Sequence, residues 1–218
     1  MAPTSAITSP KVTQASVPMR FVGPMKISAQ ASFDAAWQEK VSVPLATYEI
    51  PLWHSVGRGA RVSNLCNEGI KTTLIDERMT RSILLEAKDA HQALGAWQSI
   101  QMRQQEMQDI VGQTSRFATL FNMNMQIVAN LLYLRLEFNT GDASGHNMVT
   151  HAADSLMQWL LKQYPQLSYS SISGNYCSDK KATVVNGILG RGKYVVAELT
   201  VPRALCERKL NTTPEKVV

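Results

Sequence analysis

Two adjacent lysines, Lys180 and Lys181, have the residue type and spacing to do chemistry. They follow Ser178 and Asp179, either of which can cap a helix, and the next residues, ATVVNG, are typical of one or two helical turns that end at Gly187. Two ammonium groups and free backbone N–H groups would then converge, and they could stabilise an anion or a developing oxyanion. The alternative is that both side chains extend into solvent, at a cost of roughly a few tenths of a kcal/mol against the helix dipole.

Two glycine-containing stretches could bind phosphate. GILGRGKY, residues 187–194, fits the spacing GxxxxGK, but Tyr194 stands where a phosphate-binding loop needs Ser or Thr, and the stretch follows a predicted helix instead of a strand. We therefore interpret it as a glycine-rich turn between a helix and a strand. TGDASGHNM, residues 140–148, is a loop of small residues before a predicted helix, where backbone could approach a diphosphate. An ordinary loop has the same composition.

Three further side chains are candidates for phosphate binding or proton transfer. Ser115 and Arg116, at a predicted strand start in TSRF, could bind a phosphate, with the guanidinium as a bidentate partner. The alternative for Arg116 is an ordinary surface arginine. Glu49 lies between apolar neighbours in ATYEIPLW, where burial would favour the protonated carboxyl and make it a candidate proton donor. The alternative for Glu49 is a position at a strand edge that faces water.

The composition argues against several classes of protein. The four histidines have no spacing typical of metal ligands, and the three cysteines lie far apart without a CxxC pair, so we expect no metal site. No apolar run approaches the roughly 18 residues of a membrane span, and no positively charged start followed by an apolar run marks a secretory signal. The net charge of +5 comes from scattered Lys and Arg, which argues against nucleic-acid binding. We therefore predict a cytoplasmic protein that binds neither membranes nor nucleic acids.

The ends of the chain differ in texture from its middle. Residues 1–16 are rich in Ser, Thr, Pro and Ala, which predicts a mobile segment. Residues 17–81 hold short apolar runs broken by Gly and Pro, which predict strands and irregular connections instead of long helices. Residues 173–218 share that texture, with the short lysine helix followed by a strand, YVVAELTV.

The middle of the chain, residues 82–172, has a regular order of elements. A strand, SILLEA, precedes a helix that Asp89 can cap and that extends to about Val111. Two strands follow, of which the second, at 132–138, alternates apolar and polar residues, and then a helix at about 144–163 and a strand, LSYSSIS. The order β-α-β-β-α-β is that of ferredoxin-like domains. We therefore expect an α+β protein in which a small domain interrupts a larger one.

Together these stretches resemble the 3-hydroxy-3-methylglutaryl-coenzyme A reductase family in content and in order, from VPMRFVGP at residues 17–24 to the C-terminus. The resemblance implies NADPH-dependent reduction of 3-hydroxy-3-methylglutaryl-coenzyme A to mevalonate and coenzyme A by two hydride transfers. It also implies a larger substrate-binding domain, formed by residues 17–81 and 173–218, that is interrupted by a ferredoxin-like NADP(H)-binding domain at 82–172.

The resemblance also implies a role for individual residues. In VPLATYE and SGNYCSDKK, Glu49 would supply a proton and Lys180 would stabilise negative charge on a carbonyl oxygen as the catalytic pair. The implied substrate-binding residues, from DERMTR and SGNYCSDKK, are Arg81, Ser173, Asp179 and Lys181. The implied cofactor-binding residues, from TSRF and GDASGHNM, are Ser115, Arg116, Asp142, Gly145 and Asn147.

The sequence departs from the family pattern in three places. SPKVT stands where the family usually carries a motif of the type ENxxG that helps form the dimer, and His146 replaces a residue that is often Met. The family's catalytic aspartate and histidine lie downstream of anything present before Val218. We therefore expect the N-terminal portion of a longer, homo-oligomeric enzyme, with an incomplete larger domain. The alternative is a truncated NADP(H) and acyl-coenzyme A binding module without turnover.

Overall fold

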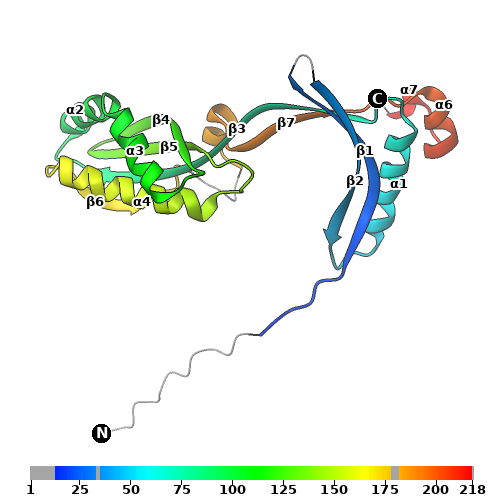
Figure 1. Cartoon of the computed structure of the whole chain (residues 1–218), viewed down its shortest axis with the longest axis horizontal. Coiled ribbons are helices and arrows are strands. Elements are labelled where there is room, and N and C mark those ends of the chain that lie inside the picture. Colours follow the sequence, from blue (N-terminus) through cyan, green and yellow to red (C-terminus); the bar gives the residue numbers. More distant parts are fainter. Residues whose placement is uncertain (1–12, 33–34, 178–181, 218) are drawn as a thin grey trace, which may run out of the picture. The chain divides into compact units, whose positions relative to one another are not determined.

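A computed structural model describes residues 13–32, 35–177 and 182–217 (Figure 1). The predictions for residues 1–12 and for Asp179, Lys180 and Lys181 lie outside these ranges. The chain divides into two units, which we describe separately. Unit 1 consists of Met1–Thr73 and Ala197–Val218, and unit 2 of Leu74–Val196.

Unit 1 is built on a long antiparallel pair of strands. Its elements are β1 (Met19–Ser32), β2 (Ala35–Ala46), α1 (Pro51–Leu65), the first residues of β3 (Ile70–Glu86), α6 (Arg203–Leu205), η1 (Cys206–Leu210) and α7 (Pro214–Val217). Met19 pairs with Ala46 at one end of the hairpin, and β1 also pairs in parallel with the start of β3. The helix α1 packs against β1 and buries Ala60 and Val62.

The helix α1 corrects the sequence prediction, which expected only strands and irregular connections in residues 17–81. Pro51 begins the helix at a position where its missing N–H group costs nothing. Gly57 and Gly59 lower the intrinsic helix propensity by about 1 kcal/mol each, and they obscured the helical pattern. Packing of the helix against β1 compensates for that low propensity, and such packing is not visible in a local window of sequence.

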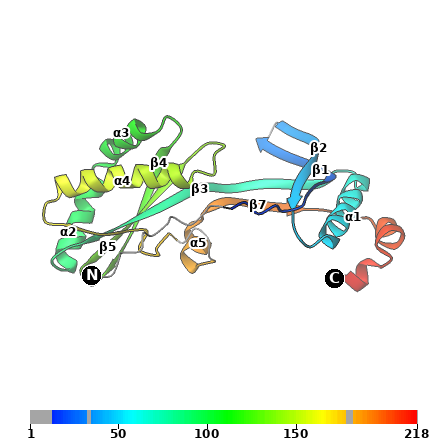
Figure 2. The same cartoon turned by 90° about the horizontal axis from the view of Figure 1, so that it is seen from below.

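Unit 2 holds an antiparallel sheet and the helices that cover it (Figure 2). Its elements after β3 are α2 (Ala90–Gln101), α3 (Gln104–Thr114), β4 (Thr119–Val128), β5 (Leu131–Asn139), α4 (His146–Gln163), β6 (Ser168–Ile172), α5 (Val184–Leu189) and β7 (Gly192–Glu198). The strand order is β6-β3-β5-β4 with antiparallel neighbours, and β7 also pairs with β3. The predicted order β-α-β-β-α-β is confirmed, except that the first helix is interrupted between Gln101 and Gln104 and forms α2 and α3.

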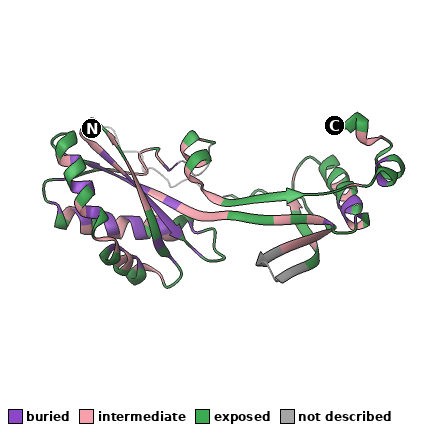
Figure 3. Cartoon of the chain, turned by 90° about the horizontal axis from the view of Figure 1, so that it is seen from above, coloured by how far each residue is buried: buried purple, intermediate pink, exposed green. Residues whose placement is uncertain are grey.

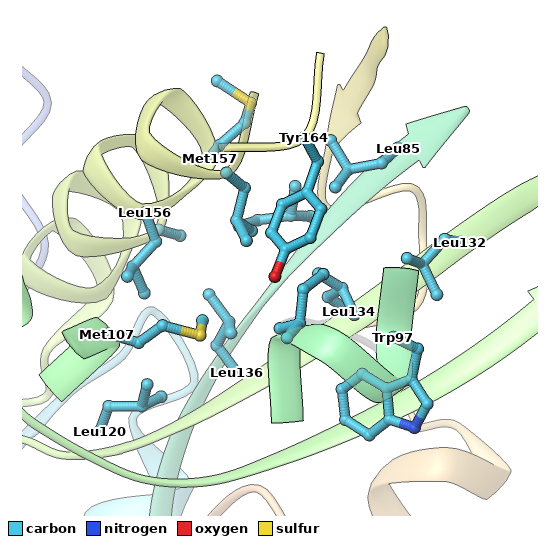
Figure 4. Packing of buried hydrophobic residues seen from close by; sticks show 14 of the residues in the cluster. Leu85, Trp97, Met107, Leu120, Leu132, Leu134, Leu136, Leu156, Met157 and Tyr164 are labelled. Atoms are coloured by element: carbon cyan, nitrogen blue, oxygen red, sulfur yellow. The ribbon is translucent and has the colours of Figure 1, made fainter. Parts of the chain in front are cut away.

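The core of unit 2 lies between the helices and one face of this sheet. Leu132, Leu134 and Leu136 are fully buried, as their alternation along β5 predicts (Figure 4). Phe138, the next residue of this alternation, is fully buried as well. The helices contribute apolar faces to the same cluster, including Trp97, Met107, Leu156 and Met157. Figure 3 shows that buried residues are concentrated in this sheet and these helices, whereas most of β1 and β2 is exposed where burial is described. Among the helices of the described residues, none is both long and apolar enough to cross a bilayer.

The cap of α2 provides a test of the fold. The carboxylate of Asp89 accepts a hydrogen bond of 2.8 Å from the backbone N–H of Gln92, as the sequence predicts. Asp89→Ala removes that acceptor, so we expect the free energy of unfolding to fall by about 0.5–2 kcal/mol in a urea titration followed by circular dichroism. Asp89→Asn keeps a side-chain oxygen and should lose much less. Equal losses in the two variants would contradict the capping role.

Candidate functional site

The strand register of unit 2 brings three segments to one end of the sheet. Thr119 at the start of β4 pairs with Asn139 at the end of β5, and Phe138 pairs with Met79 of β3. The turn that contains Ser115 and Arg116 leads into the start of β4. The loop at 140–145 leaves the end of β5 next to it. The structure thus brings together two motifs that the sequence places more than one element apart.

A cavity of about 570 Å³ lies in unit 2 at this end of the sheet. One side is formed by the loop after β5 and the start of α4, and another by α5 and the start of β7. Its lining residues are Glu77, Arg78, Met79, Phe138, Thr140, Ala143, Ser144, His146, Ala182, Asn186, Arg191, Gly192 and Lys193. The ammonium group of Lys193 forms an ion pair with Glu77. Arg78 likewise forms ion pairs, with Asp76 and Glu137, so these two cations of the lining can act on an anionic ligand only at contact distance.

The loop between β5 and α4 has a backbone that only glycine allows at Gly145. Gly145 has φ +75°, and a Cβ atom there would lie 2.5 Å from the side chain of Thr140. The Thr140 hydroxyl in turn donates a 2.8 Å hydrogen bond to the carbonyl of Ala143. Within the described part of the chain no side chain caps the N-terminus of α4, so backbone N–H groups of its first turn are available to a ligand or water. Asp142 and Asn147 are exposed on either side of Gly145.

Ser115 and Arg116 form a turn between α3 and β4, not the start of the strand as predicted. Ser115 is the C-cap of α3, and its hydroxyl accepts hydrogen bonds from the N–H groups of Phe117 (3.1 Å) and Ala118 (3.3 Å). Because of these bonds, the strand β4 begins only at Thr119. The guanidinium of Arg116 lies 4.8 Å from the centre of the Phe117 ring and is exposed. A guanidinium that stacks on a ring keeps its in-plane N–H groups for a phosphate.

Arg81 and Ser173 are close through the backbone of neighbouring strands. The N–H of Ser173 donates a 2.7 Å hydrogen bond to the carbonyl of Ser82, the residue after Arg81. Cys177 closes the turn, because its sulfur accepts from the N–H of Ser82 and its thiol donates to the hydroxyl of Ser173 at 3.6 Å. Arg81 is half-buried and lies opposite Leu136 in the register.

The helix that follows the lysine motif differs from the prediction. It begins at Val184 and ends at Leu189, whereas we expected a helix capped at Ser178 or Asp179 and ending at Gly187. Thr183 is the N-cap, with an extended backbone and a hydroxyl that accepts from the N–H of Asn186 at 3.2 Å. The boundary of this helix therefore differs from the prediction at both ends. The predicted role of Lys180 and Lys181 lies outside the described residues and stays a prediction.

Glu49 is an exposed residue of unit 1, in the short connection between β2 and α1. The strand ends at Ala46, so Glu49 occupies neither the buried setting nor the strand edge that we considered. Its N–H donates a 2.9 Å hydrogen bond to the hydroxyl of Thr47, which fixes the backbone just before the helix.

The sequence analysis missed a second cavity, of about 460 Å³, in unit 1. Arg58 and Arg61 of α1 and Lys209 of η1 line it, together with Val62, Asn64 and Leu65. No acidic residue is among the lining residues described. Arg58 and Arg61 are three positions apart and lie on one side of a helix, a signal that becomes visible only once the helix is recognised.

Two negative predictions concern metals and magnesium-dependent phosphate binding. GILGRGKY is a helix-to-strand turn as predicted, with positive φ at Gly190 (+80°) and Gly192 (+78°) between α5 and β7. Within the described residues, no group of three or more His, Cys, Asp or Glu side chains could hold a metal ion.

Comparison with known families decides the relationship of the chain. Residues 10–218 match the family model described as hydroxymethylglutaryl-coenzyme A reductase. The chain belongs to this family.

Individual reductases show the extent of the similarity. The chain is 41% identical over 202 residues to the 3-hydroxy-3-methylglutaryl-coenzyme A reductase of Pyrococcus horikoshii, which covers 92% of this chain and 48% of that protein. The reductase of Aeropyrum pernix is 35% identical over 204 residues, with 92% and 47% coverage. The chain thus spans about half the length of the curated relatives it matches.

A solved structure shares the mixed α+β fold. The class II reductase from Streptococcus pneumoniae, solved bound to NADPH in open conformations, superimposes with a TM-score of 0.60 at 16% identity. The match covers 79% of this chain and 46% of that chain.

Gly145 allows a direct test of the loop geometry. Gly145→Ala places a methyl group against Thr140 at positive φ, so we expect a loss of about 1–3 kcal/mol in the free energy of unfolding, measured by urea titration. Gly112→Ala is the matched control, because Gly112 lies in α3 with nothing within 4 Å of an added Cβ. It should gain about 0.5–1 kcal/mol. A Gly145→Ala protein as stable as wild type would show that the loop adopts another backbone.

Proposed function

We propose that this chain takes part in the NADPH-dependent reduction of 3-hydroxy-3-methylglutaryl-coenzyme A to mevalonate and coenzyme A by two hydride transfers. The observation that carries the proposal is the family match over residues 10–218. The cation-lined cavity between the loop after β5 and the α5–β7 turn supports it, because both the cofactor and the thioester substrate carry phosphates. The proposal includes a cytoplasmic, homo-oligomeric protein.

We propose that NADPH binds unit 2, with residues 82–172 as a ferredoxin-like cofactor domain inserted in the larger domain. The antiparallel order β6-β3-β5-β4 supports this assignment. Ser115 and Arg116 would hold the extra phosphate, and the loop with Asp142, Gly145 and Asn147 would hold the dinucleotide. The residues fit the group, since Gly141 has open space at its Cβ position and α4 has no side-chain cap. When bound, NADPH supplies the hydride.

The larger domain, residues 17–81 and 173–218, would bind the acyl substrate. Arg81, Ser173, Asp179 and Lys181 are the proposed substrate-binding residues, and Ser173 lies beside the backbone of Ser82 in support of a shared site with Arg81. Lys180 would stabilise the negative charge that develops on the carbonyl oxygen, and Glu49 would supply a proton. This role of Lys180 does not need a helix dipole, because an ammonium group within hydrogen-bond distance stabilises an oxyanion by itself.

The cavity of unit 1 extends the proposal to coenzyme A. Arg58, Arg61 and Lys209 would contact its phosphates, and the apolar side chains Val62 and Leu65 would contact its uncharged part. This division of cations and apolar atoms matches a ligand that is charged at one end and weakly polar along its length.

The decisive experiment measures NADPH binding and oxidation by the same preparation. Protein is titrated with NADPH by fluorescence, 3-hydroxy-3-methylglutaryl-coenzyme A is added, and the absorbance of NADPH is followed. We expect binding and oxidation, with a rate reduced by about 10²–10³ in Lys180→Ala, because an oxyanion contact is lost. Binding without oxidation would favour the second candidate, a binding module of the same family that lacks turnover. A chain that does not bind NADPH would overturn the proposal.

The coenzyme A cavity predicts a charge-dependent affinity. Arg61→Ala should weaken binding of coenzyme A roughly 10- to 100-fold, the usual effect of removing a hydrogen bond to a charged group, and the loss should shrink at high salt. Arg203→Ala is a control, because that arginine forms an exposed ion pair with Glu215 and does not line the cavity. Isothermal titration calorimetry measures both. Equal losses of affinity in the two variants would show that the effect comes from the net charge of the protein and not from a contact in the cavity.

A further inference from the structure

A buried carboxylate with four hydrogen-bond donors lies on the second face of the unit 2 sheet. Glu137 of β5 is fully buried, and one of its oxygens accepts from Arg78 (2.7 Å) and from Asn122 (2.9 Å). The other oxygen accepts from Asn124 (2.9 Å) and from Arg135, which is also fully buried. The carboxylate therefore has its full number of hydrogen bonds, contributed by β3, β4 and β5.

The remaining charges of this network balance one another. Arg78 donates two hydrogen bonds, of 2.7 and 2.8 Å, to Asp76, so the network contains two cations and two anions. Burial lowers the pKa of Arg135, and the neighbouring carboxylate of Glu137 opposes that shift. A buried, balanced ion network often contributes little more stability than apolar residues of the same volume would. Its importance therefore lies in the geometry that it imposes.

The network holds the turn between α5 and β7. The second amino group of Arg135 donates to the carbonyl of Gly190. Gly190 has φ +80°, and a Cβ atom at this position would lie 2.7 Å from a carboxylate oxygen of Asp76 and 3.3 Å from the guanidinium of Arg78. The next residue, Arg191, donates to the hydroxyl of Thr80 at 3.4 Å. The turn is thus held against charged groups of β3 and β5.

The turn between α5 and β7 forms one side of the unit 2 cavity. The loop that follows β5 forms the other side. Asn186, Arg191 and Lys193 line the cavity from the α5–β7 side. From the segment that directly follows β5, the lining residues are Thr140, Ala143, Ser144 and His146. Arg135 lies on β5 itself, so one strand carries both the group that anchors the turn and the loop opposite it.

We propose that Arg135 and Glu137 are positioning residues of the unit 2 site: they hold Gly190 so that the α5–β7 side and the loop at 140–146 remain at the separation that binds the cofactor. The inference rests on the proposed function in naming NADPH as that ligand. Only an arginine can join the two acceptors, because its separate amino groups reach the Glu137 carboxylate and the Gly190 carbonyl at once. The lysine ammonium has a single nitrogen for both.

Three variants of the full chain separate positioning from stability. Arg135→Lys keeps the charge but loses one of the two contacts, and Gly190→Ala pushes the turn away from Asp76 without touching Arg135. Ile100→Ala, in α2 on the apolar face of the sheet, lowers stability and does not line the cavity. We expect the dissociation constant for NADPH to rise about tenfold in the first two variants and to stay unchanged in the third.

Amide hydrogen exchange without ligand tests the same inference independently of NADPH. Exchange of residues 182–196 should accelerate selectively in Arg135→Lys and Gly190→Ala, relative to β4 and α4, but not in Ile100→Ala. If Arg135→Lys does not fold, the Gly190→Ala variant by itself still tests the positioning role. Unchanged NADPH binding and uniform exchange in Gly190→Ala would overturn the inference. Selective exchange in a chain that fails to bind NADPH would overturn the proposed function and leave the positioning role supported.

Discussion

The alternation of apolar and charged residues along β5 constrains the rest of unit 2. Leu134, Leu136 and Phe138 face the helices, whereas the alternating residues Arg135 and Glu137 are equally buried on the other face. Buried charges are costly unless they are paired and hydrogen-bonded, so the second face needs partners of defined position. Those partners come from β3, β4 and the Gly190 turn. One strand thus determines what covers both faces of the sheet.

The location of the unit 2 cavity follows from this two-sided covering. Helices α2, α3 and α4 cover the apolar face, while the α5–β7 turn covers the charged face near Gly190. Thr119 at the start of β4 pairs with Asn139 at the end of β5. The segment before β4 and the segment after β5 therefore leave the sheet at the same end. Connections at the end of a rigid sheet can present backbone and side chains to a ligand without disturbing the core.

The sequence predicted elements whose signal is local. The period of two in residues 132–138 and the cap at Asp89 are both confirmed. The helix α1 was missed because its stability depends on packing, and the α5 boundary was wrong because Thr183 competed with other short polar residues that cap equally well. The contact of Arg135 with Gly190 joins residues 55 positions apart, and no local pattern contains such information.

The two cavities differ in how the charges of their cations are balanced, and this difference bears on the proposed function. In unit 2, Arg78 is paired with Asp76 and Glu137, and Lys193 with Glu77, so much of the local charge is neutralised inside the protein. In unit 1, no acidic residue is among the described residues that line the cavity beside Arg61. Unpaired surface cations attract anions over a Debye length, whereas paired ones act only at contact distance. In the function that we propose, long-range attraction of a phosphate-rich ligand would therefore belong to unit 1, and fine positioning to unit 2.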